Sequence, residues 1–398
     1  MKKILLLGGS IQQIPAIEYA NKQGYYTVLC DYLPDNPGQH YADKFYCVST
    51  TDQNAILEVA QKEKVDGIVA YASDPAAPTA AYVAEQLGLP TNPYASVEIL
   101  AYKDMFRDFL RKNDFNCPYS RSFASFEEAQ DSICDFGFPV MVKPVDSSGS
   151  KGVTKIESAV ELKTAFETAM SYSRGKRVII EEFIAMDHDF MIGGDCFVLD
   201  GQVAFWGLLN CHRDLSVDPL VPVGKSHPVQ ISEARKREVK KELQRLVELL
   251  DIRFGAFNIE VMIDNRDKVY LIEVGPRNGG NMIPDLLQMI TGVDLVAATV
   301  DAAMGKNNID LSYVEQESHY ATHVLHTAKD GTFAGISFHG GIEEKIVKNV
   351  IYKKKGDPVQ YFDGANKAIG IIFLKFSALE EMLDVMAHPE RWIKVLVE

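Results

Sequence analysis

Short apolar runs alternate with longer amphipathic stretches over roughly the first 95 residues. The apolar runs predict strands, and the stretches with helical periodicity predict helices. The predicted strands are 3–7, 27–30 and 67–70, and the predicted helices are 14–23, 53–63 and 78–87. Strands that alternate with helices in this way indicate a parallel sheet with helices on both faces.

The pattern changes after a proline-bearing break at 89–93. A helix is predicted near 95–112, and the next segments predict strands at 120–123, 139–143 and 178–181 with helices at 126–136 and 158–173. Residues 190–210 read as two antiparallel strands joined by a turn at Asp200-Gly201. A helix follows at 232–250, where apolar residues recur at helical spacing. Beyond about residue 310 the chain is rich in strands and glycine, with a last helix near 378–386.

These elements predict an α/β and α+β multidomain protein with three parts. We expect an N-terminal α/β domain with a parallel sheet at 1–95 and a central region at 96–310. A lid subdomain is expected at about 118–185, and a small C-terminal α+β domain with antiparallel strands at 311–398.

Composition narrows the classes of partner. The chain has 398 residues, of which 46% are hydrophobic, and 55 acidic against 41 basic residues leave a net charge of −14. This charge argues against nucleic acid or an anionic membrane as a partner. Signal-peptide and membrane-spanning segments are not apparent, so we expect a soluble cytoplasmic protein. The six cysteines form no C-x-x-C pair and are expected to be reduced.

Two glutamates are predicted to face each other across a hairpin. In the predicted strands 256–263 and 269–274 the apolar residues share one face, and Glu260 and Glu273 lie on the other face. Matching these faces through a four-residue loop at 265–268 sets the glutamates directly opposite each other, with Cβ atoms roughly 4.5–5.5 Å apart. The carboxylates then repel unless one is protonated or a cation lies between them. The pattern favours a Mg²⁺ site, and two solvated surface glutamates are the alternative.

Arg277 follows this hairpin in a glycine-rich loop, 275–281. Arginine recognises phosphate or carboxylate through bidentate hydrogen bonds. A helix that begins near Met282 would add an anion-binding terminus. The alternative is a plain loop with a surface arginine.

Lys143 ends an apolar strand and precedes a loop with the sequence Ser-Ser-Gly-Ser-Lys-Gly at 147–152. The amides and hydroxyls of such a loop can surround phosphate oxygens, although the loop lacks the P-loop pattern and a flexible hairpin tip is the alternative. A third segment, Glu181-Glu182-Phe183-Ile184, ends an apolar strand with acidic residues. It can offer amides and a carboxylate to an adenine edge, or it can be an ordinary edge strand.

Taken in this order, the segments resemble the ATP-grasp superfamily over about residues 1–310. The resemblance is closest to L-amino-acid ligases and other carboxylate–amine ligases, and more distant to biotin carboxylase and carbamoyl phosphate synthetase. It implies that the central region 96–310 binds nucleotide and metal, and that small-molecule carboxylates and amines are the substrates. Homodimers are common among the proteins that this chain resembles, so the resemblance also implies a homodimer.

The resemblance also implies roles for individual residues. Phosphates of ATP would be bound by Lys103 and Lys143, under a mobile loop that contains Ser147, Ser148 and Gly149. The adenine would be bound by Glu181, Phe183 and Ile184, and the ribose by Asp189, which is one methylene shorter than the usual glutamate. Mg²⁺, or Mn²⁺ in its place, would be held by Glu260 and Glu273. Arg277 and Lys143 would act in catalysis on the transferred phosphoryl group or the acylphosphate.

One position departs from the family pattern Glu-x-Asn-Pro-Arg. Gly275 stands where the asparagine is usual and supplies no side chain to a metal. A second metal ion would then rely on Asn278, water or phosphate.

Residues between the nucleotide and metal motifs are candidates for contacts with the substrates. They are His212, Arg213, Lys225 and His227, each with a surface or structural role as the alternative, and Asn278 of the glycine-rich loop is a further candidate. His319, His323 and His326 lie in a predicted strand at 320–327 or just before it, where His323 and His326 are expected to point to opposite faces.

The predicted reaction is ATP- and Mg-dependent and forms ADP. A carboxylate is activated as an acylphosphate and then joined to an amine, as in peptide or amide bond formation. Alternatives are a carboxylation enzyme similar to carbamoyl phosphate synthetase or biotin carboxylase, or a catalytically silent ATP-binding protein. An NAD-dependent oxidoreductase is disfavoured because Gly8-Gly9-Ser10 lacks the G-x-G-x-x-G spacing.

Overall fold

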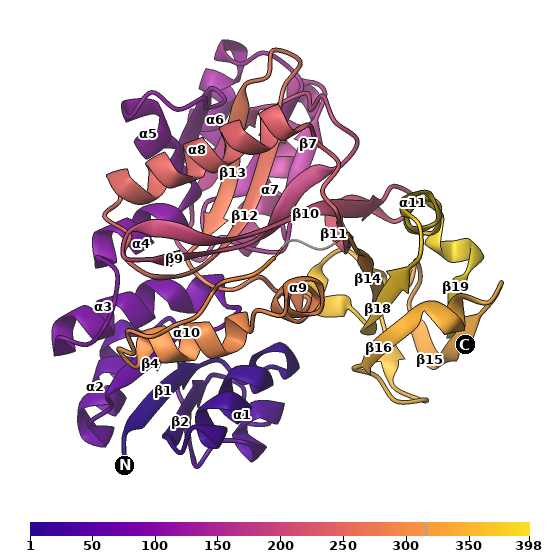
Figure 1. Cartoon of the computed structure of the whole chain (residues 1–398). Coiled ribbons are helices and arrows are strands. Elements are labelled where there is room, and N and C mark those ends of the chain that lie inside the picture. Colours follow the sequence, from indigo (N-terminus) through magenta and orange to yellow (C-terminus); the bar gives the residue numbers. More distant parts are fainter. Residues whose placement is uncertain (315–316) are drawn as a thin grey trace.

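A computed structural model describes residues 1–314 and 317–398. The N-terminal part contains a parallel sheet in the order β3-β2-β1-β4 (Figure 1). Its strands are β1 (Lys3–Leu7), β2 (Tyr26–Asp31), β3 (Lys44–Cys47) and β4 (Gly67–Val69). Apolar clusters cover both faces, as the strand–helix alternation predicted. The covering helices are α1 (Ile14–Lys22), α2 (Gln53–Glu63), α3 (Ala77–Leu87) and, from far along the chain, α10 (Leu295–Ala303).

The single helix predicted at 95–112 is wrong. The structure has α4 (Tyr94–Ala101) and α5 (Lys103–Lys112), because Tyr102 between them adopts extended backbone angles, φ −110° and ψ 118°. Lys103 therefore becomes the first residue of a helix, and its amide donates to the Val145 carbonyl oxygen at 2.9 Å.

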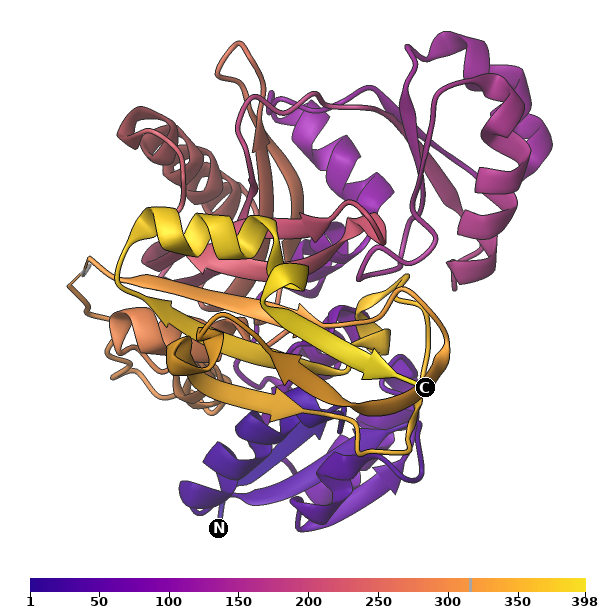
Figure 2. The same cartoon turned by 90° about the vertical axis from the view of Figure 1, so that its right-hand side faces the viewer.

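A four-stranded antiparallel sheet stands apart from the rest of the molecule at the upper right of Figure 2. Its order is β5-β8-β6-β7, and its strands are β5 (Ser120–Phe123), β6 (Val140–Pro144), β7 (Thr154–Ile156) and β8 (Val178–Glu182). The helices α6 (Phe126–Ser132) and α7 (Leu162–Tyr172) pack on it through a core of their own. This unit covers the residues for which a lid was predicted, and its role as a lid stays a prediction.

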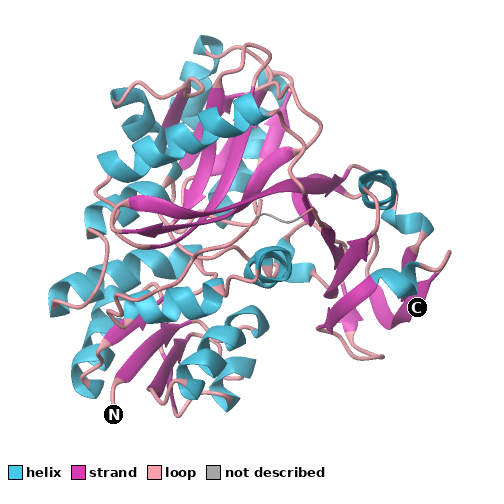
Figure 3. Cartoon of the chain, in the orientation of Figure 1, coloured by secondary structure: helices cyan, strands magenta, loops and turns pink. Residues whose placement is uncertain are grey.

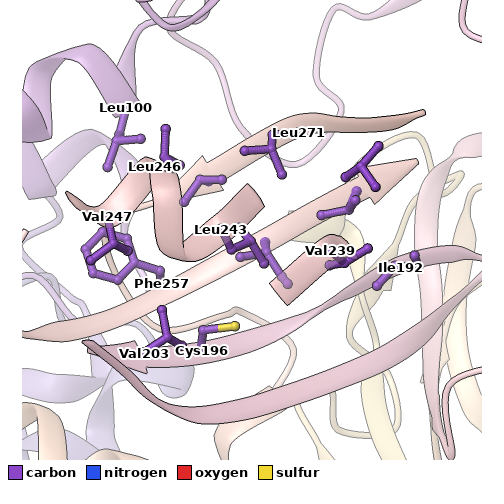
Figure 4. Close-up of a cluster of buried hydrophobic side chains, with 14 of the residues drawn as sticks. Leu100, Ile192, Cys196, Val203, Val239, Leu243, Leu246, Val247, Phe257 and Leu271 are labelled. Carbon is purple, nitrogen blue, oxygen red and sulfur yellow. The ribbon is translucent and has the colours of Figure 1, made fainter. Parts of the chain in front are cut away.

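An eight-stranded antiparallel sheet forms the centre of the molecule, in the order β13-β12-β9-β10-β11-β14-β18-β16. Its strands are β9 (Met191–Leu199), β10 (Gln202–Asp214), β11 (Asp218–His227), β12 (Gly255–Ile263), β13 (Val269–Gly275), β14 (His319–Leu325), β16 (Ile346–Ile351) and β18 (Gly370–Phe376). The helix α8 (Glu233–Leu249) directs Val239, Leu243 and Leu246 toward one face of the sheet (Figure 4). The helix α9 (Ile283–Thr291) buries Leu286 and Leu287 in a second cluster.

The last strands of the chain belong to two sheets. β14, β18 and β16 continue the eight-stranded sheet, whereas β15 (Gly331–Phe338), β17 (Pro358–Val359) and β19 (Ile393–Val397) form a small antiparallel sheet. The helix α11 (Leu379–Ala387) lies above these strands in Figure 3 and shares one apolar cluster with both sheets. The predicted fold class is confirmed. The predicted limit at 310/311 stays a prediction, and the sheet hydrogen bonds continue across it.

Within the described ranges, no single helix is long and apolar enough to cross a membrane; only α9 and α10 together, bent by 114°, meet that test of length and composition.

Candidate active site

A cavity of about 760 Å³ lies between the lid sheet, the eight-stranded sheet and the end of α11. Most of the predicted site residues line it, from segments that are distant in the sequence. They are Lys103, Lys143, Ser147, Ser148, Gly149, Glu181, Phe183, Ile184, Asp189, His212, Arg213, Glu260 and Glu273. The volume falls in the range of about 300–1,000 Å³ that is typical of small-molecule sites.

Glu260 and Glu273 are register partners on β12 and β13, as predicted. The way the chain achieves this differs from the prediction. The loop spans residues 264–268, one residue longer than expected, and a bulge at Ile272 restores the pairing of the two glutamates. Within the structure's described part, no group of three or more His, Cys, Asp or Glu side chains is arranged to hold a metal ion.

The charge around Glu273 is unfavourable for its ionised form. Burial raises the pKa of Glu273, the charges of Asp74 and Glu260 raise it further, and Lys103 opposes them. The Lys103 Nζ lies 3.6 Å from the Glu273 carboxylate. A hard divalent cation would relieve the repulsion between the two glutamates, so this pair fits a Mg²⁺ ion.

Two lysines, Lys103 and Lys143, line the same cavity as these glutamates. Lys103 Nζ donates to the Ser147 carbonyl oxygen at 2.7 Å, which ties the start of α5 to the serine-rich loop. Lys143 Nζ lies 2.6 Å from Glu181 Oε2. Both lysines line the same cavity, Lys103 bound to the loop 147–152 and Lys143 paired with Glu181.

Glu181 belongs to a buried ion-pair network that the sequence analysis did not anticipate. Arg107 of α5 is 1% exposed, and its Nε lies 2.8 Å from Glu181 Oε1. Arg107 also donates to the carbonyl oxygen of Ile272 at 2.9 Å. Burial alone would raise the pKa of Glu181, but Arg107 and Lys143 outweigh it and lower the pKa to about 2. The predicted contact between Glu181 and adenine stays a prediction.

This network predicts an acid-sensitive contribution to stability. Because the pKa of Glu181 is lower in the folded protein than in the unfolded chain, the ionised carboxylate stabilises the folded state. This stabilisation is complete at pH values above the unfolded-state pKa of about 4.3 and is lost as the pH falls toward 2. We expect it to amount to about 3 kcal/mol. Urea unfolding measured between pH 7 and pH 3 checks this, and Glu181→Gln should unfold with a weaker pH dependence over the same window. Identical pH dependence in the two proteins would contradict the assignment.

Arg277 does not line the main cavity and instead lines a separate space of about 100 Å³. Its guanidinium forms a bidentate pair with Asp74, which follows β4 in the N-terminal part, and Nε lies 2.6 Å from Asp74 Oδ1. Burial would raise the pKa of Asp74, but Arg277 outweighs it and lowers the pKa. The sequence analysis missed Asp74, although its place after the carboxyl end of a parallel strand is a common position for ligand-binding residues.

Gly275 makes room for this pair. A Cβ on residue 275 would lie 2.8 Å from Asp74 Oδ1 and 3.3 Å from Arg277 Nε. The asparagine that is usual in the family pattern would therefore collide with the pair, and the departure at this position has a steric reason.

Gly275→Ala is expected to separate Arg277 from Asp74 and to cost about 1–3 kcal/mol of stability through overpacking. Chemical denaturation measures this loss. The matched control is Gly280→Ala in the same loop, because the nearest atom to its Cβ would be the flexible end of Gln12 at 3.3 Å. Equal stability of the two variants would contradict the steric argument.

Asp195 is a second residue that the sequence pattern did not indicate, and it binds the glycine-rich loop 275–281. It is fully buried and accepts hydrogen bonds from the Gly279 amide at 2.8 Å and from Asn258 Nδ2 at 2.9 Å. Burial raises the pKa of Asp195 to about 6 against the lowering effect of these donors. Asn278, predicted as a substrate or metal contact, is buried away from the cavity, and its Oδ1 accepts from Thr299.

The remaining candidates lie on β10 and β11. His212 contacts Ser226 Oγ through Nε2 at 2.8 Å, and burial lowers its pKa to about 3. Arg213 has a buried Nη1 without a hydrogen-bond partner. Lys225 and His227 are buried but do not line the cavity.

The prediction that His323 and His326 point to opposite faces is wrong. β14 ends before His326, and the two rings lie 5.7 Å apart.

Residues 136–285 match the family model of the ATP-grasp domain. The chain contains an ATP-grasp domain. A carbamoyl phosphate synthase large chain from Thermotoga petrophila is 25% identical over 324 residues, which are 77% of this chain and 29% of that protein. This chain therefore spans less than a third of the length of that relative.

Two other proteins match over nearly their whole length. A formate-dependent phosphoribosylglycinamide formyltransferase from Saccharolobus solfataricus is 26% identical, with 96% of this chain and 94% of that protein covered. The crystal structure of an L-amino acid ligase from Bacillus licheniformis superposes with a TM-score of 0.81 at 18% identity and covers 100% of this chain and 99% of that one. This structural likeness shows a shared fold.

Proposed function

We propose that the protein is an ATP- and Mg-dependent ligase that activates a carboxylate as an acylphosphate and joins it to an amine, forming ADP. The observation that carries the proposal is the placement of Glu260 opposite Glu273 in one cavity with Lys103 and Lys143. Carboxylate pairs that hold a cation and lysines that neutralise phosphate are the groups that phosphoryl transfer needs.

The nucleotide would occupy the end of the cavity under the lid sheet. Lys103 and Lys143 would bind its phosphates, and the loop with Ser147, Ser148 and Gly149 would cover them. Phe183, Ile184 and Asp189 also line the cavity, and the base and ribose would lie against them. Lys143 would exchange part of its pairing with Glu181 for a phosphate oxygen, and Arg107 would keep the Glu181 carboxylate neutralised.

Glu260 and Glu273 would hold Mg²⁺, or Mn²⁺ in its place. The bound ion would supply positive charge to the phosphate oxygens. Such an ion explains why two like charges are tolerated at neighbouring positions on one face of the sheet.

The chain's own residues would position the reactants and exclude water. Arg277, directed by Asp74, would bind the transferred phosphoryl group or the acylphosphate from the side of the N-terminal part. Ser150 Oγ donates to the Leu220 carbonyl oxygen at 2.9 Å, so the serine-rich loop already rests on β11. A loop in that position would protect an acylphosphate from hydrolysis.

The substrate carboxylate and amine would enter between β10, β11 and α11. Arg213 offers an unpaired buried donor to an anion, and Met386 and Pro389 contribute apolar surface from the C-terminal part. His212 stays neutral near pH 7 because its pKa is about 3, so it suits hydrogen bonding to a substrate better than proton storage.

A second candidate is a reaction on a one-carbon acid. The formate-dependent relative matches this chain over 94% of its own length, which favours a similar reaction. The cavity of about 760 Å³ leaves room for a larger acid and favours the first candidate.

The test is turnover with ATP, Mg²⁺ and pairs drawn from a panel of amino acids, other organic acids and formate. We expect release of ADP and phosphate that depends on both partners, and mass spectrometry identifies the amide product. Release with formate and an amine alone would support the second candidate. ATP binding without turnover on any pair would instead indicate a catalytically silent protein.

A further inference from the structure

A buried lysine and a buried cysteine meet on neighbouring strands beside the proposed active site. Cys211 on β10 and Lys225 on β11 are register partners, and Lys225 Nζ lies 2.6 Å from Cys211 Sγ. Cys211 is 3% exposed and Lys225 is 7% exposed. Cys211 is one of the residues that line the large cavity.

The two atoms are closer than a hydrogen bond alone accounts for. Ordinary N–H···O bonds centre on about 2.9 Å, and sulfur is a larger atom than oxygen. A separation of 2.6 Å is close to the span of two single bonds through one bridging oxygen atom. An oxygen added to the sulfur would therefore lie within bonding reach of the nitrogen.

The surroundings favour a reactive pair. Among the described residues, Lys225 Nζ has no carboxylate within ion-pair distance, and a buried ammonium without a counter-charge is costly. Peroxide oxidises a cysteine first to a sulfenic acid. The Lys225 nitrogen then lies within reach of the oxidised Cys211 sulfur.

Gly193 on β9 leaves the space in which the pair lies. A Cβ on residue 193 would be 2.4 Å from Cys211 Sγ and 2.6 Å from Lys225 Nζ. Gly193 is also the register partner of Glu260 on β12, which places the pair next to the two facing glutamates.

We propose that Cys211 and Lys225 are the site of a reversible oxidative modification, a covalent cross-link in which one oxygen atom bridges Sγ and Nζ. The oxidant is a peroxide. The link forms within the sheet and needs no movement of the backbone, because the two atoms already face each other across β10 and β11.

Hydrogen peroxide balances the reaction in two steps. The first peroxide transfers an oxygen to the Cys211 sulfur, which becomes a sulfenic acid as the O–O bond breaks and water leaves. In the second step an O–N bond replaces the sulfenic O–H and one N–H of the neutral Lys225 amine. The second peroxide takes up the two electrons and two hydrogens and leaves as two molecules of water.

The cross-link would also act on the proposed ligase, and this part rests on the proposed function. The bridge replaces the Lys225 amine and the Cys211 thiol by one covalent link, which changes the packing next to Gly193 and its register partner Glu260. We expect peroxide to lower turnover and an excess of dithiol reductant to restore it.

The decisive experiment is mass spectrometry of the full-length protein after treatment with hydrogen peroxide, which requires no knowledge of the substrates. The intact mass should rise by one oxygen and fall by two hydrogens. Proteolysis should yield one peptide pair joined through residues 211 and 225, and reductant should separate it.

Matched variants make the assignment specific. Cys211→Ser and Lys225→Met should lose the cross-link, and Gly193→Ala should weaken it by separating the pair. Cys196→Ser should keep it, because Cys196 is equally buried in the same sheet but its register partner on β10 is Trp206 and not a lysine. If the wild-type protein yields only sulfinic or sulfonic acid at Cys211, or a direct S–N bond, the proposal is wrong, whatever the protein's catalytic activity.

Discussion

Replacing Glu273 by glutamine is expected to lower ligase turnover by about 10³-fold or more, because preorganised charge at the site of phosphoryl transfer carries effects of this size. Glutamine keeps the shape of the side chain but removes one of the two carboxylates that face each other across β12 and β13. Steady-state release of ADP and phosphate measures the loss. Turnover that stays near the wild-type value would overturn the assignment of Glu273 as a metal ligand.

The same variant should be at least as stable as the wild-type protein. The raised pKa of Glu273 means that the folded protein favours the protonated form, so the ionised side chain lowers stability at neutral pH. Thermal unfolding without nucleotide or metal checks this. The control is Glu157→Gln, an exposed glutamate paired with Lys155, which should leave turnover unchanged. If Glu273→Gln proves much less stable than the wild-type protein, its loss of turnover would be due to misfolding.

Arg107→Met is expected to destabilise the protein by about 3–5 kcal/mol, because it leaves the buried Glu181 carboxylate with only Lys143 as a partner. Methionine keeps most of the side chain's length and apolar contact, so the loss reports on charge. The free energy of unfolding in urea measures it.

The matched control is Arg111→Met on the next turn of α5. Arg111 is about half exposed and pairs with Asp108 at 2.8 Å, so its removal should cost about 0–1 kcal/mol. Similar losses in the two variants would show that the Arg107–Glu181 pair contributes little beyond an exposed ion pair.

The sequence predicted the parts of the site that depend on local pattern. Alternation along β12 and β13 was enough to place Glu260 opposite Glu273, even though the loop length was wrong and a bulge compensated for it. Lys143 and the serine-rich loop were recognisable because they follow a strand directly. The helix break at Tyr102 was not, because no proline or glycine marks it.

Residues that act through long-range pairing escaped the sequence analysis. Asp74 and Arg277 are 203 positions apart, and Arg107 and Glu181 are 74 apart. Each looks like an ordinary charged residue in its own segment. Only the packing of the N-terminal part and of α5 against the eight-stranded sheet shows that these charges are buried and paired.

The strand order of the eight-stranded sheet also determines how long one strand edge stays unpaired during synthesis on the ribosome. β11 pairs on its outer side with β14, which is synthesised about a hundred residues later, with α8, the β12–β13 hairpin, α9 and α10 in between. Until β14 emerges, the nascent chain carries an open strand edge next to the Cys211–Lys225 pair. Open edges are templates for pairing with other chains, so the interval between the synthesis of His227 and that of His319 is when this protein is most exposed to aggregation.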